Sequence, residues 1–308
     1  MIIAILVFVS AFILLSVIAF FGMAFAVMRQ DRPMTIPNKK ISESSFDTLY
    51  GNAIAEGRRW IEHIPFSEEI IASQDGTRLV GKFYRNGASE KTVLLMHGYR
   101  SSPMHDFACA FKFYFDKGFN LMVPDQRAHG KSGGKFITFG VKERFDAAAW
   151  MEHINTLIPC GEIYAYGVSM GASTLLMASS LTLPENLRGI IADCGFTSPA
   201  AIIKKVIKED MRFPIFPFYG ITRLMTRIVA GFDFEEYSAV TAVEQAQVPI
   251  LMLHGRADCF VPFSMGEEIF NAARCEKQAV WVDGADHGCS FMTDPEACSK
   301  ALYGFLGV

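Results

Sequence analysis

Short apolar runs recur between residues 68 and 282, each bounded by Gly, Pro or Asp, and this pattern constrains the fold most strongly. The predicted strands are residues 68–73, 79–85, 92–97, 119–124, 163–167, 188–193, 249–254 and 279–282. The helix-like stretches are residues 104–117, 141–157, 170–181, 264–274 and 294–306. Strands alternating with helices predict an α/β fold, with a mostly parallel eight-stranded sheet covered by helices on both faces. Ligands bind beyond the carboxyl ends of such strands, so chemistry is expected there.

Residues 1–28 contain no charged side chain, and about 20 apolar residues suffice to span a bilayer as a helix. We expect a single-pass membrane anchor that stands apart from the main domain. The basic residues that follow are Arg29, Arg32, Lys39 and Lys40. Basic flanks favour the cytoplasm, which places the main domain on the cytoplasmic side. A cleaved signal peptide is the alternative, because Ala24-Phe25-Ala26 resembles a cleavage site, although such peptides have a shorter apolar core and a basic start.

The rest of the 308-residue sequence indicates a tether and excludes some classes of partner and cofactor. Residues 29–65 are polar and contain prolines, which predicts a tether that ends in a short helix at 46–62. The net charge is −3 and no block of Lys and Arg occurs, so nucleic acid is not expected as a partner. The 7 cysteines include no C-x-x-C pair, which indicates neither a zinc site nor a disulfide framework. We expect no metal and no cofactor.

The pattern G-x-S-x-G occurs twice, around Ser169 and around Ser132. Ser169 follows a predicted strand and opens a helix-like stretch, which is the strand–turn–helix context of a nucleophile elbow. Ser132 lies in a long loop with no helix after it. Serine is also a common helix N-cap, so the pattern alone is weak evidence and the context decides. Ser169 is therefore the predicted nucleophile.

A serine nucleophile needs a base, and the base needs a group that orients it. His287 lies just beyond the last predicted strand, and Asp258 closely follows the strand 249–254. The chain order Ser, Asp, His is the one expected for a hydrolase with a nucleophile elbow. We therefore predict a triad of Ser169, Asp258 and His287. Asp193 also ends a strand and is the alternative acid.

An acyl-transfer site also needs N–H donors for the oxyanion that develops on the substrate. The backbone N–H of Met170, directly after the nucleophile, is one predicted donor. The other is expected in the loop after the third strand, where we choose the backbone N–H of Tyr99. His97, in the same loop, is interpreted as a structural residue that hydrogen-bonds the loop.

These motifs resemble those of the α/β-hydrolase superfamily. The resemblance covers about residues 66–308 and rests on LLMHGYRSS, PDQRAHGKSGG, YGVSMGAS, LHGRADCFVP and DGADHG. Within the superfamily the chain resembles the branch of serine aminopeptidases and monoglyceride lipases, closest to members with one N-terminal anchor helix and a compact cap. The resemblance implies the α/β-hydrolase fold, with Ser169 as nucleophile, Asp258 as acid and His287 as base.

The predicted triad indicates two-step acyl transfer to water through an acyl-enzyme. We expect a hydrolase of carboxylic esters or thioesters, whose substrates are small ester or acyl compounds. A peptidase or amidase is the alternative. The acidic residues that could recognise a free N-terminus are Glu209, Asp210, Glu235 and Glu236. A catalytically silent binding or scaffold protein is a third possibility, against which the intact triad argues.

Residues 196–246 separate the sixth and seventh predicted strands by far more than the common 2–6 residue connection, which predicts a small helical cap over the site. Aromatic residues gather in MRFPIFPFYGITRLM, where Pro214 and Pro217 are expected to prevent a regular helix. The predicted lining of a pocket for lipid-like acyl groups is Phe213, Phe216, Phe218 and Tyr219. The alternative is that these side chains only pack the cap onto the domain.

Overall fold

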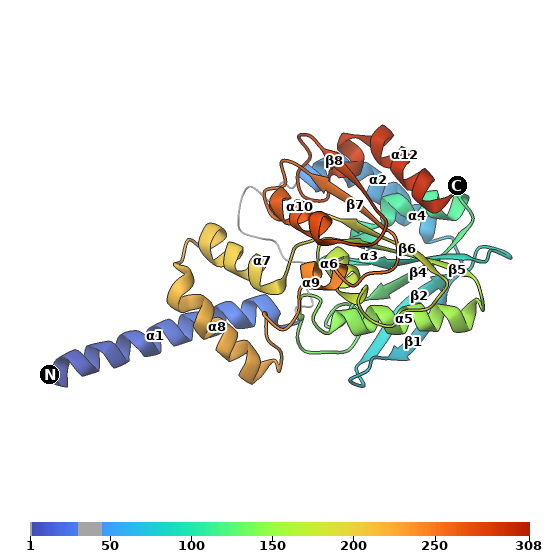
Figure 1. The fold of residues 1–308 in the computed structure, drawn as a ribbon. Helices are drawn as coiled ribbons and strands as arrows, with labels where there is room; N and C mark the ends of the chain where they lie inside the picture. The colour runs from blue at the N-terminus through green and yellow to red at the C-terminus, as the bar shows by residue number, and fades with distance from the viewer. Residues whose placement is uncertain (1, 30–44) are drawn as a thin grey trace.

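The computed structural model describes residues 2–29 and 45–308, and its centre is an eight-stranded sheet (Figure 1). The strands are β1 (Ser67–Ala72), β2 (Arg78–Tyr84), β3 (Lys91–Met96), β4 (Phe119–Asp125), β5 (Glu162–Val168), β6 (Leu187–Asp193), β7 (Ile250–Gly255) and β8 (Lys277–Val282). Their order is β1-β2-β4-β3-β5-β6-β7-β8. β2 pairs antiparallel with β1 and β4, and the pairs from β4 to β8 are parallel. The predicted mostly parallel eight-stranded sheet is confirmed.

Helices cover both faces of the sheet because its central strands carry apolar side chains on both sides. On β3, Leu94 and Met96 face one core whereas Val93 and Leu95 face the other, as the two-residue period of a strand requires. The helices over the core that contains Leu94 are α5 (Glu143–Leu157), α6 (Met170–Ala178) and α10 (Phe263–Ala272). The helices over the other core are α2 (Ser45–Ile61), α4 (Ala108–Asp116) and α12 (Pro295–Leu306). Figure 1 shows the sheet between these two layers. Two short helices, α3 (Pro103–Asp106) and α11 (Ser290–Thr293), lie in the connections.

The connection from β6 to β7 is helical, as predicted. Its elements are α7 (Pro199–Lys205), the π-helical turn η1 (Val206–Asp210), α8 (Ile215–Val229) and α9 (Ala239–Val243). Pro214 and Pro217 were expected to prevent a regular helix. This expectation is wrong for the residues after Phe216, which form a continuous helix up to Val229. Phe216 itself has non-helical angles, with φ −94° and ψ 131°. Pro217 then stands in the first turn of the continuous helix, where its missing N–H removes no helical hydrogen bond.

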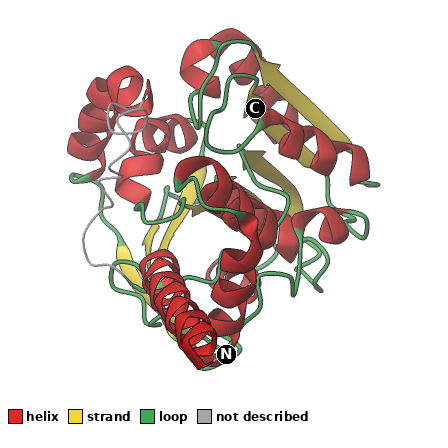
Figure 2. Ribbon diagram, turned by 90° about the vertical axis from the view of Figure 1, so that its left-hand side faces the viewer, coloured by secondary structure: helices red, strands yellow, loops and turns green. Residues whose placement is uncertain are grey.

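The N-terminal helix α1 (Ile2–Val27) packs against the cap helix α8 (Figures 1 and 2). Its residues Ala19, Met23 and Val27 are buried in the core that also contains side chains of α6. The end of α1 is also tied to a loop of the main domain, since Ile137 N–H donates to Val27 O at 2.7 Å. The expectation of a segment that stands apart from the domain is therefore wrong for the second half of α1, whose apolar side chains have partners within the protein.

No helix within residues 2–29 and 45–308 is long and apolar enough to cross a membrane. The structure thus does not support the expected membrane span. Residues 30–44, which make up much of the predicted tether, lie outside the described residues. The short helix predicted at 46–62 is present as α2.

We expect the docking of α1 to stabilise the folded chain. Met23→Asp would bury a charge without a partner, so the free energy of unfolding should fall by about 3 kcal/mol. Phe21 lies on the same helix and is 67% exposed. Phe21→Asp is the matched control and should change that free energy by less than about 1 kcal/mol. Urea unfolding of the full chain measures both, and equal effects would show that α1 is not docked.

Candidate active site

Ser169 lies in a sharp turn between β5 and α6. Its backbone angles, φ 54° and ψ −113°, are unfavourable for a residue with a side chain. Two glycines permit the turn. A Cβ on Gly171 would lie 1.9 Å from Met96 O on β3, and a Cβ on Gly167 would lie 2.3 Å from the carbonyl carbon of Gly171. The strand–turn–helix arrangement expected of a nucleophile elbow is therefore present around Ser169.

The three predicted triad residues meet at the carboxyl end of the sheet. His287 Nε2 lies 3.0 Å from Ser169 Oγ, and His287 Nδ1 lies 2.8 Å from Asp258 Oδ2. Asp258 comes from the loop after β7 and His287 from the loop after β8. In this geometry Nδ1–H donates to the carboxylate, which leaves Nε2 to accept the serine proton.

Asp258 is held rigidly by its own loop. Its Oδ1 accepts hydrogen bonds from Phe260 N–H at 2.9 Å and from Val261 N–H at 2.8 Å. Its Oδ2 is also 3.4 Å from Nε2 of His254, which contacts Val261 O at 3.0 Å. His254 is not among the site residues predicted from the sequence. The feature of the sequence that could have indicated it is a histidine at the end of an apolar strand, four residues before the predicted acid.

Burial and charge have opposite effects on the pKa values of His287 and Asp258. Burial opposes the charged form of His287, but the charge of Asp258 and the hydrogen bond to it outweigh burial and raise the pKa of His287 above its ordinary value. Burial would also raise the pKa of Asp258, but the charge of His287 and the hydrogen bonds of His254 and His287 lower it well below its usual range. Asp258 therefore stays ionised at neutral pH and can stabilise an imidazolium.

The alternative acid, Asp193, has other partners. Its Oδ2 accepts from Tyr166 OH at 3.3 Å, and its Oδ1 has no hydrogen-bond partner among the described residues. Burial raises the pKa of Asp193 to about 6. The backbone of Asp193 does support the turn, because Ser169 N–H donates to its carbonyl at 2.8 Å. Nδ1–H of His287 donates its hydrogen bond to Asp258 and not to Asp193, so the geometry favours Asp258 as the candidate acid.

The second G-x-S-x-G sequence has a structural role. Ser132 is buried, donates to Asp125 O at 2.6 Å and accepts from Val80 N–H at 2.8 Å. These bonds fasten its loop to β2 and β4. The hydroxyl of Ser132 is thus used within the fold, which agrees with the choice of Ser169 as the candidate nucleophile.

The loop after β3 lies against the nucleophile turn. A Cβ on Gly98 would be 3.5 Å from Ser169 Cβ, and Gly98 N–H already donates to Asp106 Oδ2 at 2.7 Å. Within the described part of the chain, neither Tyr99 N–H nor Met170 N–H donates a hydrogen bond. Both groups remain able to bind an oxyanion, and that role stays a prediction.

His97 fixes the start of this loop, as the sequence analysis proposed. Its Nδ1 donates to Gly98 O at 2.8 Å, and its Nε2 accepts from Gln126 N–H at 3.1 Å. Burial, and then the neighbouring His129, lower the pKa of His97. A neutral His97 is required for the acceptor role of Nε2, so His97 is structural.

The side chain of Cys194 lies next to the imidazole of the triad, a position that was not predicted from the sequence. Cys194 follows β6, is buried, and has its Sγ 3.9 Å from His287 Nε2. The side chains of Cys194, Asp258 and His287 are close enough to contact one metal ion. Burial raises the pKa of the Cys194 thiol well above its ordinary value, and a protonated thiol is a poor metal ligand. Asp258 and His287 already bond each other, so this group disfavours a metal, and the expectation of a metal-free site stays a prediction.

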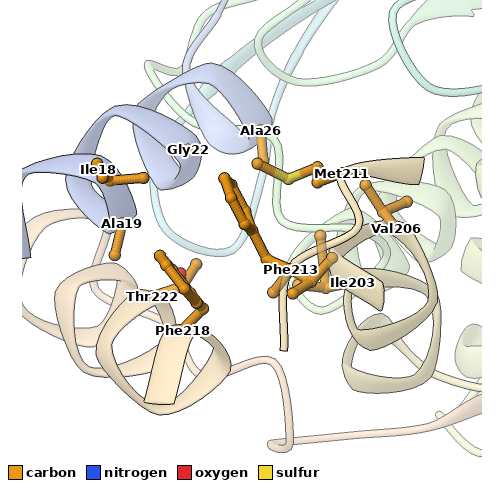
Figure 3. Close-up of a pocket in the computed structure, with 11 residues that line it drawn as sticks. Ile18, Ala19, Gly22, Ala26, Ile203, Val206, Met211, Phe213, Phe218 and Thr222 are labelled. Atoms are coloured by element: carbon orange, nitrogen blue, oxygen red, sulfur yellow. The ribbon is translucent and has the colours of Figure 1, made fainter. Parts of the chain in front are cut away.

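The predicted pocket residues separate into two groups. Phe213 and Phe218 line an apolar cavity between the cap and α1 (Figure 3). Phe216 is 87% exposed, and its backbone is extended. Tyr219 is buried within the cap, where its hydroxyl donates to Glu235 Oε1 at 2.9 Å. Neither Phe216 nor Tyr219 lines this cavity, and their assignment to a substrate pocket stays a prediction.

Comparisons with known proteins agree with the fold. A family model described as alpha/beta hydrolase fold matches residues 91–217. The esterase Pf2001 of Pyrococcus furiosus is similar in structure, with a TM-score of 0.65 at 22% identity over 91% of this chain and 97% of that chain. Est1E of Butyrivibrio proteoclasticus, solved with ferulic acid bound, has a TM-score of 0.60 at 19% identity over 77% of this chain and 97% of its own. The protein thus has the α/β-hydrolase fold.

The chain is also similar in sequence to curated proteins, among them the following two. The uncharacterised protein YqkD of Bacillus subtilis is 24% identical over 84% of each chain. The bifunctional esterase/perhydrolase DCH of Acinetobacter calcoaceticus is 22% identical over 77% of this chain and 98% of its own. The resemblance to the branch of serine aminopeptidases and monoglyceride lipases stays a prediction.

The raised pKa of His287 has a consequence for the pH dependence of hydrolysis. A base must be neutral, so kcat/KM should fall as the pH drops through the pKa of His287, which lies above the usual value of about 6.5. Asp258→Asn removes the charge that raises this pKa. We expect the acid limb of kcat/KM to move to lower pH and kcat to fall about 10³–10⁴-fold. An acid limb that stays in place would show that Asp258 does not set this pKa.

Proposed function

We propose that the protein is a serine hydrolase that cleaves carboxylic esters through an acyl-enzyme. The observation that carries the proposal is the chain of contacts from Ser169 Oγ through His287 to Asp258, at 3.0 Å and 2.8 Å. A serine becomes nucleophilic when an adjacent base takes its proton and a third group orients that base. Each of the three roles, nucleophile, base and orienting acid, has a candidate residue at the carboxyl end of the sheet.

The proposed reaction has two steps. Ser169 Oγ attacks the ester carbonyl while His287 Nε2 takes its proton, and Asp258 stabilises the resulting imidazolium. The negative charge that develops on the carbonyl oxygen is bound by the backbone N–H groups of Met170 and Tyr99. As the intermediate collapses, the ester C–O bond breaks, the imidazolium gives its proton to the leaving alkoxide, and the acyl-enzyme remains. A water molecule activated by His287 attacks the acyl-enzyme, which releases the carboxylic acid and restores the serine.

Two observations favour an ester over an amide substrate. The esterase Pf2001 and the esterase/perhydrolase DCH are among the similar proteins. Two of the four cap acids considered for binding a free N-terminus are engaged elsewhere: Glu235 pairs with Lys204 at 3.1 Å and Asp210 pairs with Lys205 at 3.2 Å. A peptidase would need an acidic group free to bind the substrate, which leaves only Glu209 and Glu236 for this role, so hydrolysis of amides is the weaker hypothesis. Membrane attachment and a cytoplasmic location stay predictions from the sequence.

The role of Ser169 can be tested by covalent labelling. Ser169→Ala should abolish both ester hydrolysis and labelling by a fluorophosphonate probe, because the attacking oxygen is lost. Ser132→Ala is the matched control from the other G-x-S-x-G sequence, and it should still label once urea unfolding shows that it is folded. Labelling that survives in Ser169→Ala and disappears in folded Ser132→Ala would overturn the assignment.

The acyl preference follows from the apolar cavity beside the cap. Each buried methylene contributes up to about 0.8 kcal/mol, so kcat/KM should rise at least ten-fold from an acetyl to an octanoyl ester. A series of p-nitrophenyl esters below their micelle concentrations measures this. A profile that is highest for acetyl and falls with chain length would contradict a pocket for apolar acyl groups.

A further inference from the structure

The second half of α1 and the cap enclose an apolar cavity (Figure 3). Ala19, Gly22 and Ala26 of α1 form one wall, and their small size leaves the space open. Phe213 and Ile203 lie on the cap side. The cavity volume is about 40 Å³, which has room for only the end of a chain.

We propose that this cavity binds the distal end of a long acyl chain whose carbonyl carbon is attacked by Ser169. The N-terminal helix thereby becomes part of the substrate site. The inference rests on the proposed ester hydrolysis. It gives α1 a role in binding the substrate, which goes beyond the roles of the catalytic residues.

The α1 wall is connected to the oxyanion side of the active site. Tyr99 OH donates to Ala26 O at 2.6 Å, and Ala26 lines the cavity. The backbone of the preceding residue, Gly98, lies against Ser169. One glycine and one tyrosine side chain therefore separate the nucleophile from this wall of the cavity.

The cap wall is connected to the base side of the active site. Lys205 lies between two lining residues, Ile203 and Val206, and its Nζ donates to Cys259 O at 3.2 Å. The same ammonium lies 5.4 Å from the ring centroid of Phe260, whose ring is 5.1 Å from that of His287. The two walls of the cavity are thus each in contact with residues that neighbour the triad, one on the side of Ser169 and the other on the side of His287.

The lining selects an alkyl chain over other occupants. Thr222 alone among the lining residues has a polar side-chain group, so the cavity offers nothing to a sugar, a peptide or a charged head group. The edge of the cavity is also apolar, since Met211 lines it and is 43% exposed. An alkyl chain gains free energy at both places through the removal of apolar surface from water.

Gly22→Leu tests the site by filling it. A Cβ at Gly22 would be 3.9 Å from Met211 Cε, so the further atoms of a leucine would occupy the cavity. Leucine also favours a helix more than glycine does, so α1 should persist. We expect the ratio of kcat/KM for dodecanoyl to that for acetyl p-nitrophenyl ester to fall at least ten-fold, because loss of two methylene contacts accounts for about that factor.

Gly220→Leu is the matched control. Gly220 lies on α8, is exposed, and has no atom within 4 Å of a Cβ at that position. This variant makes the same substitution in a neighbouring helix outside the cavity, and it should leave the dodecanoyl-to-acetyl ratio unchanged. If Gly22→Leu lowers kcat/KM equally for both esters, α1 acts only on the catalytic loop and the proposal is overturned. An unchanged ratio in Gly22→Leu overturns it as well.

A binding measurement separates this inference from the proposed function. Decanoic acid titrated into the Ser169→Ala protein by calorimetry reports the cavity without catalysis. Adding Gly22→Leu should weaken this binding at least ten-fold. If the wild-type protein hydrolyses no ester but this loss of binding occurs, the proposed reaction fails and the site stands. If decanoic acid binds equally with and without Gly22→Leu, the site is refuted whatever the esters show.

Discussion

The turn after β5 packs directly against β3, and this contact places every group of the candidate site. Gly171 lies so close to Met96 O that any side chain there would displace the strand. From the other side, Ser169 N–H is bonded to the carbonyl of Asp193 on β6. Because both neighbouring strands hold the turn, Ser169 keeps an unfavourable backbone conformation that would otherwise relax. The position of the hydroxyl is therefore set by the sheet, and Asp258 and His287 reach it from the ends of the next two strands.

The sheet and the meeting of the three candidate residues could be predicted because their signals are local. Apolar runs bounded by turn residues locate the strands, and parallel strands bring their carboxyl ends to one edge. His254 could not be predicted in this way. It contacts Asp258 because the chain turns back on itself after β7. This turn brings Nε2 of His254 to 3.4 Å from Oδ2 of Asp258, four residues later. The exposure of the Phe216 side chain could not be predicted either.

The packing of α1 against the cap could not be predicted from the sequence, for a different reason. Residues 1–28 are apolar on all sides of a helix, so the pattern cannot indicate which face will be buried. The buried residues Ala19, Met23 and Val27 are spaced by four, as one face of a helix requires, but their neighbours are apolar too. An apolar sequence shows that its side chains must be covered by other apolar groups, but it does not show which groups these are. Here the cap supplies them, and the cap itself could be located only as a long connection.

Tyr99 links this docked helix to the proposed chemistry. Its backbone N–H is a candidate oxyanion donor, whereas its side chain stacks on Phe139, with ring centroids 5.1 Å apart, and donates to Ala26 O. A donor to an oxyanion must stand within a few tenths of an ångström of its best position to be effective. The side-chain contacts of Tyr99 limit the movement of its own backbone, and α1 provides one of them. The helix can therefore affect catalysis without contributing an atom to the reaction, through the residue that it holds in place.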